Sequence, residues 1–118
     1  MSSLEQSDAE AGKHAVAPRV TLADIEGAIA ERHHITGSVA VWRQGGCEPR
    51  PLPDRHPLNL LSICILVMTN GFTVIGKSAP ASPENFNAEF GRKLAYEDCI
   101  RQLWPLMGFS LRDRLAAL

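Results

Sequence analysis

The side chains in this sequence that could bind a metal ion are the adjacent His33 and His34, together with Cys47 and His56. Structural zinc sites usually place their ligands in closely spaced pairs, and these residues do not follow that spacing. Two adjacent histidines near the end of a helix also point away from each other. We therefore expect the protein to bind no metal ion and no cofactor.

The cysteines and carboxylates do not form a pattern typical of catalysis. Cys99 follows Glu97 and Asp98 and lacks the cationic neighbours that lower a thiol pKa, so we interpret it as a buried structural residue. The carboxylates of this region are Glu84, Glu89, Glu97 and Asp98. They are spaced along the exterior of a predicted helix, which indicates ion pairing rather than an acid/base pair in a cleft. The sequence favours a protein that is not an enzyme.

Basic residues are concentrated in the segment 43–57, which contains Arg43, Arg50 and Arg55. Its glycines, prolines and charges have no regular period, so we expect a flexible loop. Two acidic residues partly cancel the positive charge, and no aromatic side chains are interleaved with the arginines for base stacking. The loop alone is therefore weak evidence for nucleic-acid binding.

Composition is typical of a small soluble globular domain. The 118 residues are 45% hydrophobic and 21% charged, and a net charge of −1 provides no basic excess for phosphate binding. The three cysteines follow no disulfide or ligand spacing, which indicates free thiols in a reducing cytosol. The first residues are polar and acidic, unlike a signal peptide, and the apolar run 58–68 is too short to cross a bilayer.

A β-hairpin is the clearest local structure, because Asn70-Gly71 separates two runs rich in β-forming residues. Asn-Gly favours a two-residue type I′ turn, which would pair Val67 with Val74. The predicted core face then carries Leu61, Ile63, Ile65, Val67, Phe72 and Val74. The opposite face carries Cys64, Leu66, Met68 and Ile75. This second face is too apolar to be solvated, so we expect another surface to cover part of it.

A long helix follows the hairpin. We expect it to begin at Ser82-Pro83, which are suited to the N-cap and first helical positions, and to end or kink near Trp104 because Pro105 lacks an amide. Its surface should carry a ladder of alternating charge, formed by Glu89, Lys93, Glu97 and Arg101. A strip of small residues, Ala88, Gly91 and Ala95, would let another backbone approach closely.

The remaining segments complete the expected architecture. Residues 1–18 are interpreted as a disordered arm. Thr21 with Asp24 resembles a capping box and opens a helix to about His33, and the segment 36–42 is a candidate short strand. A short C-terminal helix should cover about 111–117. We therefore predict one α+β domain over 19–118: helix, two-stranded antiparallel β-hairpin, long helix and short C-terminal helix.

Many of these residues also carry a resemblance to a known family. They are Asn70 to Val74, Gly76, Ala81 to Phe86, Glu89, Gly91 to Lys93, Ala95 and Trp104 to Gly108. Over 21–34 and 58–116 the chain resembles the family of small tailed-phage and prophage proteins known from the enterobacterial phage N4 and a Shigella phage. The resemblance implies a phage or prophage origin and a host bacterial cytoplasmic setting. It carries no catalytic residue over to this chain.

The leading functional hypothesis is an accessory phage protein that acts by protein–protein binding. Its partner would be a host protein, a phage protein or a second copy of the chain. The hypothesis is based on the apolar second face of the hairpin and on a helix that is apolar on two sides. The candidate interaction residues are Leu66, Met68, Ile75, Arg92, Lys93 and Tyr96. No membrane partner is expected.

Two alternatives belong to other functional classes. A nucleic-acid-associated protein would use the arginine-containing loop together with Arg92, Lys93 and Arg101. A small-ligand binder or small enzyme would assemble a site from Glu89, Arg92, Lys93 and loop residues, and it would require a formed pocket with perturbed ionisable groups.

Overall fold

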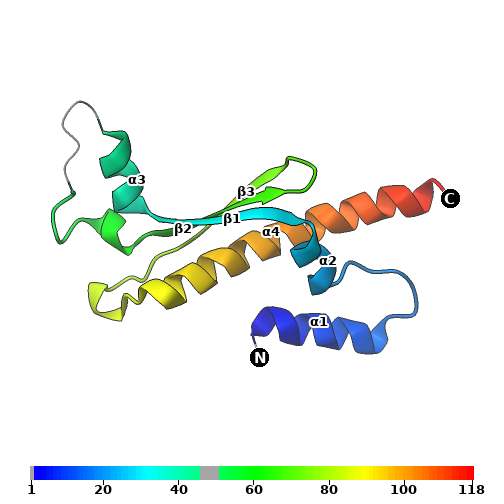
Figure 1. Cartoon of the computed structure of the whole chain (residues 1–118). Coiled ribbons are helices and arrows are strands. Elements are labelled where there is room, and N and C mark those ends of the chain that lie inside the picture. The colour runs from blue at the N-terminus through cyan, green and yellow to red at the C-terminus, as the bar shows by residue number, and fades with distance from the viewer. Residues whose placement is uncertain (1, 46–50) are drawn as a thin grey trace.

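The computed structural model describes residues 2–45 and 51–118 (Figure 1). In chain order the elements are α1 (Ser3–His14), α2 (Leu22–Gly27), β1 (Ile29–Thr36), α3 (Gly37–Gln44), the 3-10 turn η1 (Pro57–Leu60), β2 (Ser62–Met68), β3 (Thr73–Ser78), the 3-10 turn η2 (Pro83–Asn85) and α4 (Ala88–Ala116). The α+β class is confirmed. The sheet, however, has three antiparallel strands in the order β1-β2-β3, where the sequence predicted a two-stranded hairpin.

Strand β1 occupies residues that were predicted to be helical. Helix α2 has the predicted capping box, in which the Asp24 N–H donates to Thr21 Oγ1 (3.0 Å) and the Thr21 N–H donates to Asp24 Oδ2 (2.9 Å). The helix ends at Gly27, a poor helix former, and the following residues pair with β2 along its whole length. The segment 36–42, predicted as a strand, instead lies mostly in α3. Pairing with β2 therefore overrides the local helical pattern.

The turn between β2 and β3 is not the predicted two-residue turn. Gly71 has φ 88° and is the single residue with positive φ in the part of the chain that the structure describes, whereas a type I′ turn also requires positive φ at Asn70. The Gly71 N–H donates to Met68 O (2.9 Å), and the Met68 N–H donates to Phe72 O (2.8 Å). These bonds close a three-residue loop that ends in a left-handed glycine.

The longer loop shifts the register of the hairpin by one residue, so that Leu66 instead of Val67 lies opposite Val74. Such a shift moves every side chain of a strand to the other face of the sheet. The residues wrongly predicted to face the core are Leu61, Ile63, Ile65 and Val67. Phe72 lies on the predicted side, beside Leu103 and Met107 of α4, but is 52% exposed. The buried residues of β2 are Ser62, Cys64, Leu66 and Met68. On β3, Val74 is buried as predicted.

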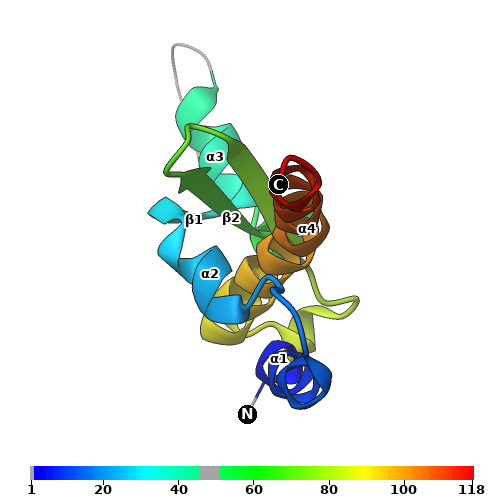
Figure 2. The same ribbon diagram turned by 90° about the vertical axis from the view of Figure 1, so that its right-hand side faces the viewer.

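Helix α4 lies against one face of the sheet (Figure 2). This face contains the buried residues of β2 and β3, and at Gly76 of β3 the backbone of α4 comes very close. A Cβ atom at Gly76 would lie 2.7 Å from Cys99 Sγ and 2.8 Å from Cys99 N, and closer still to Ala95 O. Gly91 lies against Ser62 in the same way. Of the small residues predicted to permit close approach, Ala95 meets the backbone of Gly76 and Gly91 meets the side chain of Ser62, whereas Ala88 is exposed.

Two side chains of α4 also bind the outer backbone edge of β3. The Lys77 N–H donates to Asp98 Oδ2 (3.0 Å), and Gln102 Nε2 donates to Ile75 O (2.8 Å). These backbone groups point away from β2, so without α4 they would form an open strand edge. Helix α4 thus packs on the sheet and also provides hydrogen-bond partners for backbone groups on the outer edge of β3.

Helix α4 is continuous over 29 residues, where the sequence predicted two helices. Asn87 is the N-cap and accepts from the Phe90 N–H (2.9 Å), while the predicted N-cap, Ser82, precedes η2. Pro105 lies inside the helix, which continues because Trp104 and Met107 on either side pack against the core. Glu97 of the predicted ladder is buried, and among the described residues no ion pair within 4 Å joins the ladder members.

Helix α1 occupies most of the segment expected to be a disordered arm. Ser2 Oγ caps it by accepting from the Glu5 N–H (3.2 Å), and Leu4 is its single buried residue. Asp8 Oδ1 accepts from Arg19 Nη1 (2.8 Å) and from the Leu22 N–H (3.1 Å), which ties α1 to the segment before α2. Of the predicted loop 43–57, the first two residues belong to α3, residues 46–50 lie outside the described part, and η1 begins at its last residue.

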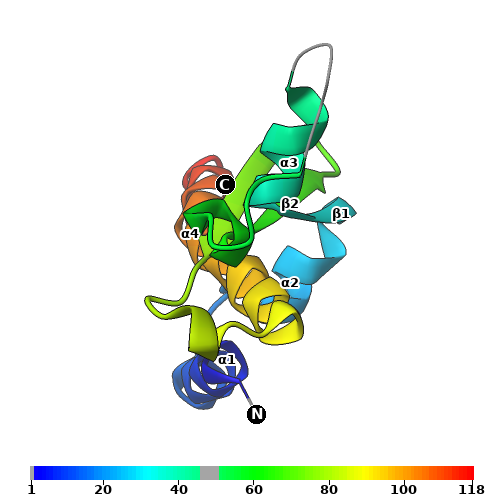
Figure 3. The ribbon, with the colours of Figure 1, turned by 90° about the vertical axis from the view of Figure 1, so that its left-hand side faces the viewer.

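The molecule is thin and elongated, with principal extents of 57 × 31 × 17 Å. Its radius of gyration is 17.6 Å, compared with about 13.5 Å for a compact domain of this length. Helix α1 lies on the side of α4 away from the sheet, and α3 stands at the end of the sheet opposite to the β2–β3 turn (Figures 1 and 3). One face of the sheet therefore has α4 against it, and the other has no helix stacked along it.

Substitution of two glycines tests this packing. Gly76→Ala should destabilise the protein by about 1–3 kcal/mol, because the methyl group would force α4 away from the sheet. Gly108→Ala is the matched control: it lies in α4 with no atom within 4 Å of the added methyl group, so it should stabilise by about 0.5–1 kcal/mol. Urea denaturation followed by circular dichroism measures both. Equal effects of the two substitutions would contradict the close approach.

Candidate interaction surface

The open face of the sheet is a regular array of nine side chains. The register places Glu31, Val67 and Thr73 in one row across the three strands. The second row is His33, Ile65 and Ile75, and the third is Ile35, Ile63 and Lys77. Ile65, on the central strand, lies in the middle of this array. We call these nine residues the open face.

Five of the nine open-face residues are aliphatic: Ile35, Ile63, Ile65, Val67 and Ile75. Antiparallel sheets with one solvated face normally place polar residues there. Ile75 is 62% exposed, and the open-face residues of the central strand are half-buried. The open face is therefore an apolar surface that no described helix covers.

Charged residues occupy two opposite corners of the open face. Glu31 lies at the β1 corner, where its carboxylate is 2.9 Å from Nε2 of His33. Lys77 lies at the diagonally opposite β3 corner. Its backbone amide is bound by Asp98, but no described carboxylate pairs with its ammonium group. The face thus has an apolar centre and opposite charges at two corners.

The candidate interaction residues from the sequence do not form one surface. Leu66 and Met68 are 0% and 5% exposed and belong to the core, so the prediction that they lie on the face opposite the core is wrong. Ile75 is on the open face. Arg92, Lys93 and Tyr96 belong to α4 on the covered side, where the Arg32 guanidinium lies 3.7 Å from the centroid of the Tyr96 ring.

Sequence reasoning missed the true exposed residues of β2 because it assigned them to the core. The alternation of Ile63, Ile65 and Val67 with Cys64 and Leu66 gives two apolar faces, and hydrophobicity alone does not indicate which one meets the helix. A useful signal was available in Gly76, since a glycine in a strand often marks close backbone approach. Val74 and Gly76 share the face of Leu66, which identifies the covered side.

A small pocket of about 80 Å³ lies between the sheet and the beginning of α4. It is lined by His34, Ile35, Thr36, Ser62, Phe86, Ala88 and Arg92. Of the residues predicted for a small-ligand site, Arg92 lines this pocket, whereas Glu89 and Lys93 do not. This pocket therefore does not include all three predicted residues.

His34 has a distinctive environment beside this pocket. Arg32 Nε donates to His34 Nε2 (2.9 Å), so the neutral ring carries its proton on Nδ1, which is closed to solvent and has no hydrogen-bond partner in the described chain. Burial lowers the pKa of His34 below 6.5, and the charges of Arg32 and Arg92 lower it further. The unfolded chain therefore takes up the charging proton at His34 more readily than the folded chain does. As a result, His34 lowers the free energy of unfolding as the pH falls below about 6.5.

The predicted metal ligands are separated. His33 and His34 are adjacent in β1, so their side chains point to opposite faces of the sheet. His56 Nδ1 accepts from the Leu58 N–H (3.1 Å), and Cys47 lies outside the described residues. Within the described residues, no group of three or more His, Cys, Asp and Glu side chains is arranged to hold a metal ion.

The two described cysteines belong to the core. Cys64 and Cys99 are both 0% exposed, and the Cys99 thiol donates to Cys64 O (3.5 Å). Burial, together with the neighbouring Cys64, raises the pKa of Cys99 to about 12. A thiol with that pKa stays protonated, so its environment does not favour nucleophilic chemistry. The interpretation of Cys99 as a buried residue is confirmed.

The basic residues proposed for nucleic-acid binding do not share a face. Arg92 and Arg101 are nine residues apart on α4, which places them on opposite sides of the helix. Arg43 lies over the Trp42 ring of α3, 4.3 Å from its centroid, and Arg50 lies outside the described residues. Arg92 and Arg101 therefore do not form one basic surface.

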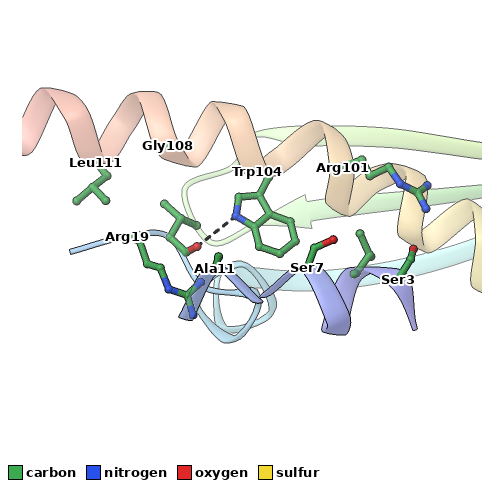
Figure 4. Close-up of a pocket in the computed structure, with 10 residues that line it drawn as sticks. Ser3, Ser7, Ala11, Arg19, Arg101, Trp104, Gly108 and Leu111 are labelled. Carbon is green, nitrogen blue, oxygen red and sulfur yellow. Dashed lines mark hydrogen bonds between the residues drawn. The ribbon is translucent and has the colours of Figure 1, made fainter. Parts of the chain in front are cut away.

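A groove of about 700 Å³ runs between α1 and α4 (Figure 4). Ser3, Ser7 and Ala11 of α1 form one wall. Trp104 lies opposite, and its indole Nε1 donates to Val20 O (3.2 Å). Leu4 of α1 also lines the groove, and Arg19 and Arg101 are its charged residues. The lining contains no carboxylate, histidine or cysteine side chain. No described helix is long and apolar enough to span a membrane.

Comparison with known proteins identifies one family. Residues 20–115 match the model of a family described as "Phage protein (N4 Gp49/phage Sf6 gene 66) family". The match spans every element from α2 through nearly all of α4, and it leaves α1 outside. No curated protein and no solved structure matches the chain.

The environment of His34 predicts the effect of a charge removal. Arg92→Gln should raise the pKa of His34, because it removes one of the positive charges that oppose protonation. Lys93→Gln is the matched control, since it removes the same charge from the next residue, which does not line the pocket. An NMR titration of the His34 ring resonances measures its pKa in both variants. An unchanged His34 pKa in the Arg92 variant would contradict the assigned environment.

Proposed function

The chain belongs to the phage protein family of N4 Gp49 and phage Sf6 gene 66, and from that premise we propose that it is an accessory phage protein that acts by protein–protein binding through the open face. The observation that carries the proposal is the uncovered aliphatic centre of the sheet, with Ile65 in its middle. We further propose that it acts in the cytoplasm of the bacterial host.

The physical argument for binding begins with the cost of exposing this surface. Removing apolar surface from water is favourable by about 25 cal/mol per Å². A partner that covers the aliphatic side chains of the open face would therefore gain binding free energy from their burial. Monomeric proteins rarely expose contiguous apolar patches, and those that they do expose usually mark interaction sites. The open face combines such a patch with flanking charges, as interfaces commonly do.

The chemistry of the described side chains supports a binding role better than catalysis. The two cysteines of the core are protonated and inaccessible, and the carboxylate of Glu97 is buried without an ion-pair partner among the described residues. The alternative of nucleic-acid binding has less support, because Arg92 and Arg101 lie on opposite sides of α4. Neither alternative is favoured by a specific arrangement of residues.

Site-specific photo-crosslinking in host cells tests the proposal. A photoreactive amino acid at position 65 should give covalent adducts of higher mass, because a bound protein would lie against the centre of the open face. The matched control has the same amino acid at position 112, which is exposed near the end of α4. Ile75→Asp in the same chain should suppress the adducts at position 65, since it places a charge in the interface.

The result that overturns the proposed function is equally specific. Position 65 would then give no adducts, or the same adducts as position 112, and Ile75→Asp would leave them unchanged. The adduct masses also separate the partners, because a second copy of this chain doubles the mass of 12.9 kDa whereas other proteins give other masses.

A further inference from the structure

We propose, on the basis of the proposed function, that the partner at the open face is a second copy of this chain, related by a two-fold axis along the diagonal Ile35–Ile65–Thr73. The axis lies between the two faces, so the two sheets stack against each other. Each copy presents the same nine residues, as a two-fold interface requires. The resulting dimer has four layers, with the two sheets inside and the two α4 helices outside.

The register of the sheet determines which residues meet across this axis. Glu31 lies over Lys77 of the second copy, and Lys77 lies over the second copy's Glu31, so the contact occurs twice. Ile65 meets its own equivalent at the centre. Val67 meets Ile75 of the second copy, which buries the aliphatic residues that the fold leaves exposed.

The other two-fold arrangements of the same array are less favourable. An axis parallel to the strands places Lys77 over Ile35 of the second copy. An axis in the plane of the sheet but perpendicular to the strands places Glu31 over Ile35 of the second copy. Both arrangements bury a charge against an aliphatic side chain, which is costly. An axis along the other diagonal places Glu31 over Glu31 and Lys77 over Lys77, so like charges repel.

The favoured axis also gives an allowed packing of two sheets. Because the axis follows a diagonal of the array, it is oblique to the strands, and the strands of the two sheets cross at a steep angle. Sheets stack in either an aligned or a near-orthogonal arrangement, and this crossing belongs to the second class. The outer edge of β3 does not take part, since Asp98 and Gln102 already satisfy its backbone groups.

Two aspartate substitutions locate the interface by sedimentation of the full chain. Ile65→Asp should convert the dimer to a monomer, because Ile65 lies at the centre of the open face. The circular dichroism spectrum should stay unchanged, because the Ile65 side chain does not belong to the core. Phe109→Asp is the matched control: Phe109 is 71% exposed on α4, away from the sheet, so the dimer should persist. A dimer lost with Phe109→Asp but retained with Ile65→Asp overturns the proposal.

Charge reversal tests the orientation of the two copies. Glu31→Lys and Lys77→Glu should each weaken dimerisation by about tenfold, because two attractive contacts become repulsive. The double variant should restore the original affinity. An equimolar mixture of the two single variants should also restore it, since a mixed dimer then has both contacts attractive. Equal affinity of all these samples overturns the diagonal axis.

The outcomes separate this inference from the proposed function. If the unmodified chain sediments as a strict monomer at high micromolar concentration while position 65 still gives specific adducts with another protein, the second copy is rejected and the binding function stands. If there is neither a dimer nor a specific adduct, both proposals are rejected. A dimer that responds to Ile65→Asp and to the charge reversals as described supports both.

Discussion

The contact between α4 and β3 at Gly76 is the constraint on which the rest of the fold depends. The absence of a side chain there lets the backbone of α4 lie directly against the strand, with Cys99 above it. That proximity brings Asp98 and Gln102 within hydrogen-bond distance of the outer edge of β3. One glycine therefore determines the separation of helix and sheet, and it allows the helix to protect an edge that would otherwise be free to pair with other chains.

The same contact explains why the opposite face of the sheet remains open. A helix of this length covers one face of a three-stranded sheet, and the other helices lie elsewhere: α1 on the far side of α4, and α3 at one end of the sheet (Figure 1). The chain thus forms two layers and is 17 Å thick in its smallest dimension. Stable domains usually bury both faces of an apolar strand. In this protein the central strand is aliphatic on both sides, and only one side is covered.

The sequence predicted the class of fold, because the start of α2 and the β2–β3 hairpin depend on local signals, the capping box at Thr21 and the Asn70-Gly71 turn. It predicted the presence of α4 but placed its beginning and its end wrongly. It predicted the wrong core face for β2, because Asn70-Gly71 is compatible with loops of two or three residues and the difference of one residue inverts the strand. It also missed β1. The polar, charged residues of β1 resemble an exposed helix, and only their pairing with β2, a contact between distant parts of the chain, makes them a strand.

Helix α4 extends past the sheet, and this has consequences for local motion. Its last buried residue is Leu103, and beyond it Pro105 and Gly108 weaken the backbone hydrogen-bond ladder. The turns after Met107, the last residue of α4 that packs against the core, contain no buried residue and are held mainly by helical bonds, so they open without disturbing the sheet. Amide hydrogen exchange in this helix should therefore be graded along its length, slow where it covers Gly76 and progressively faster toward Ala116.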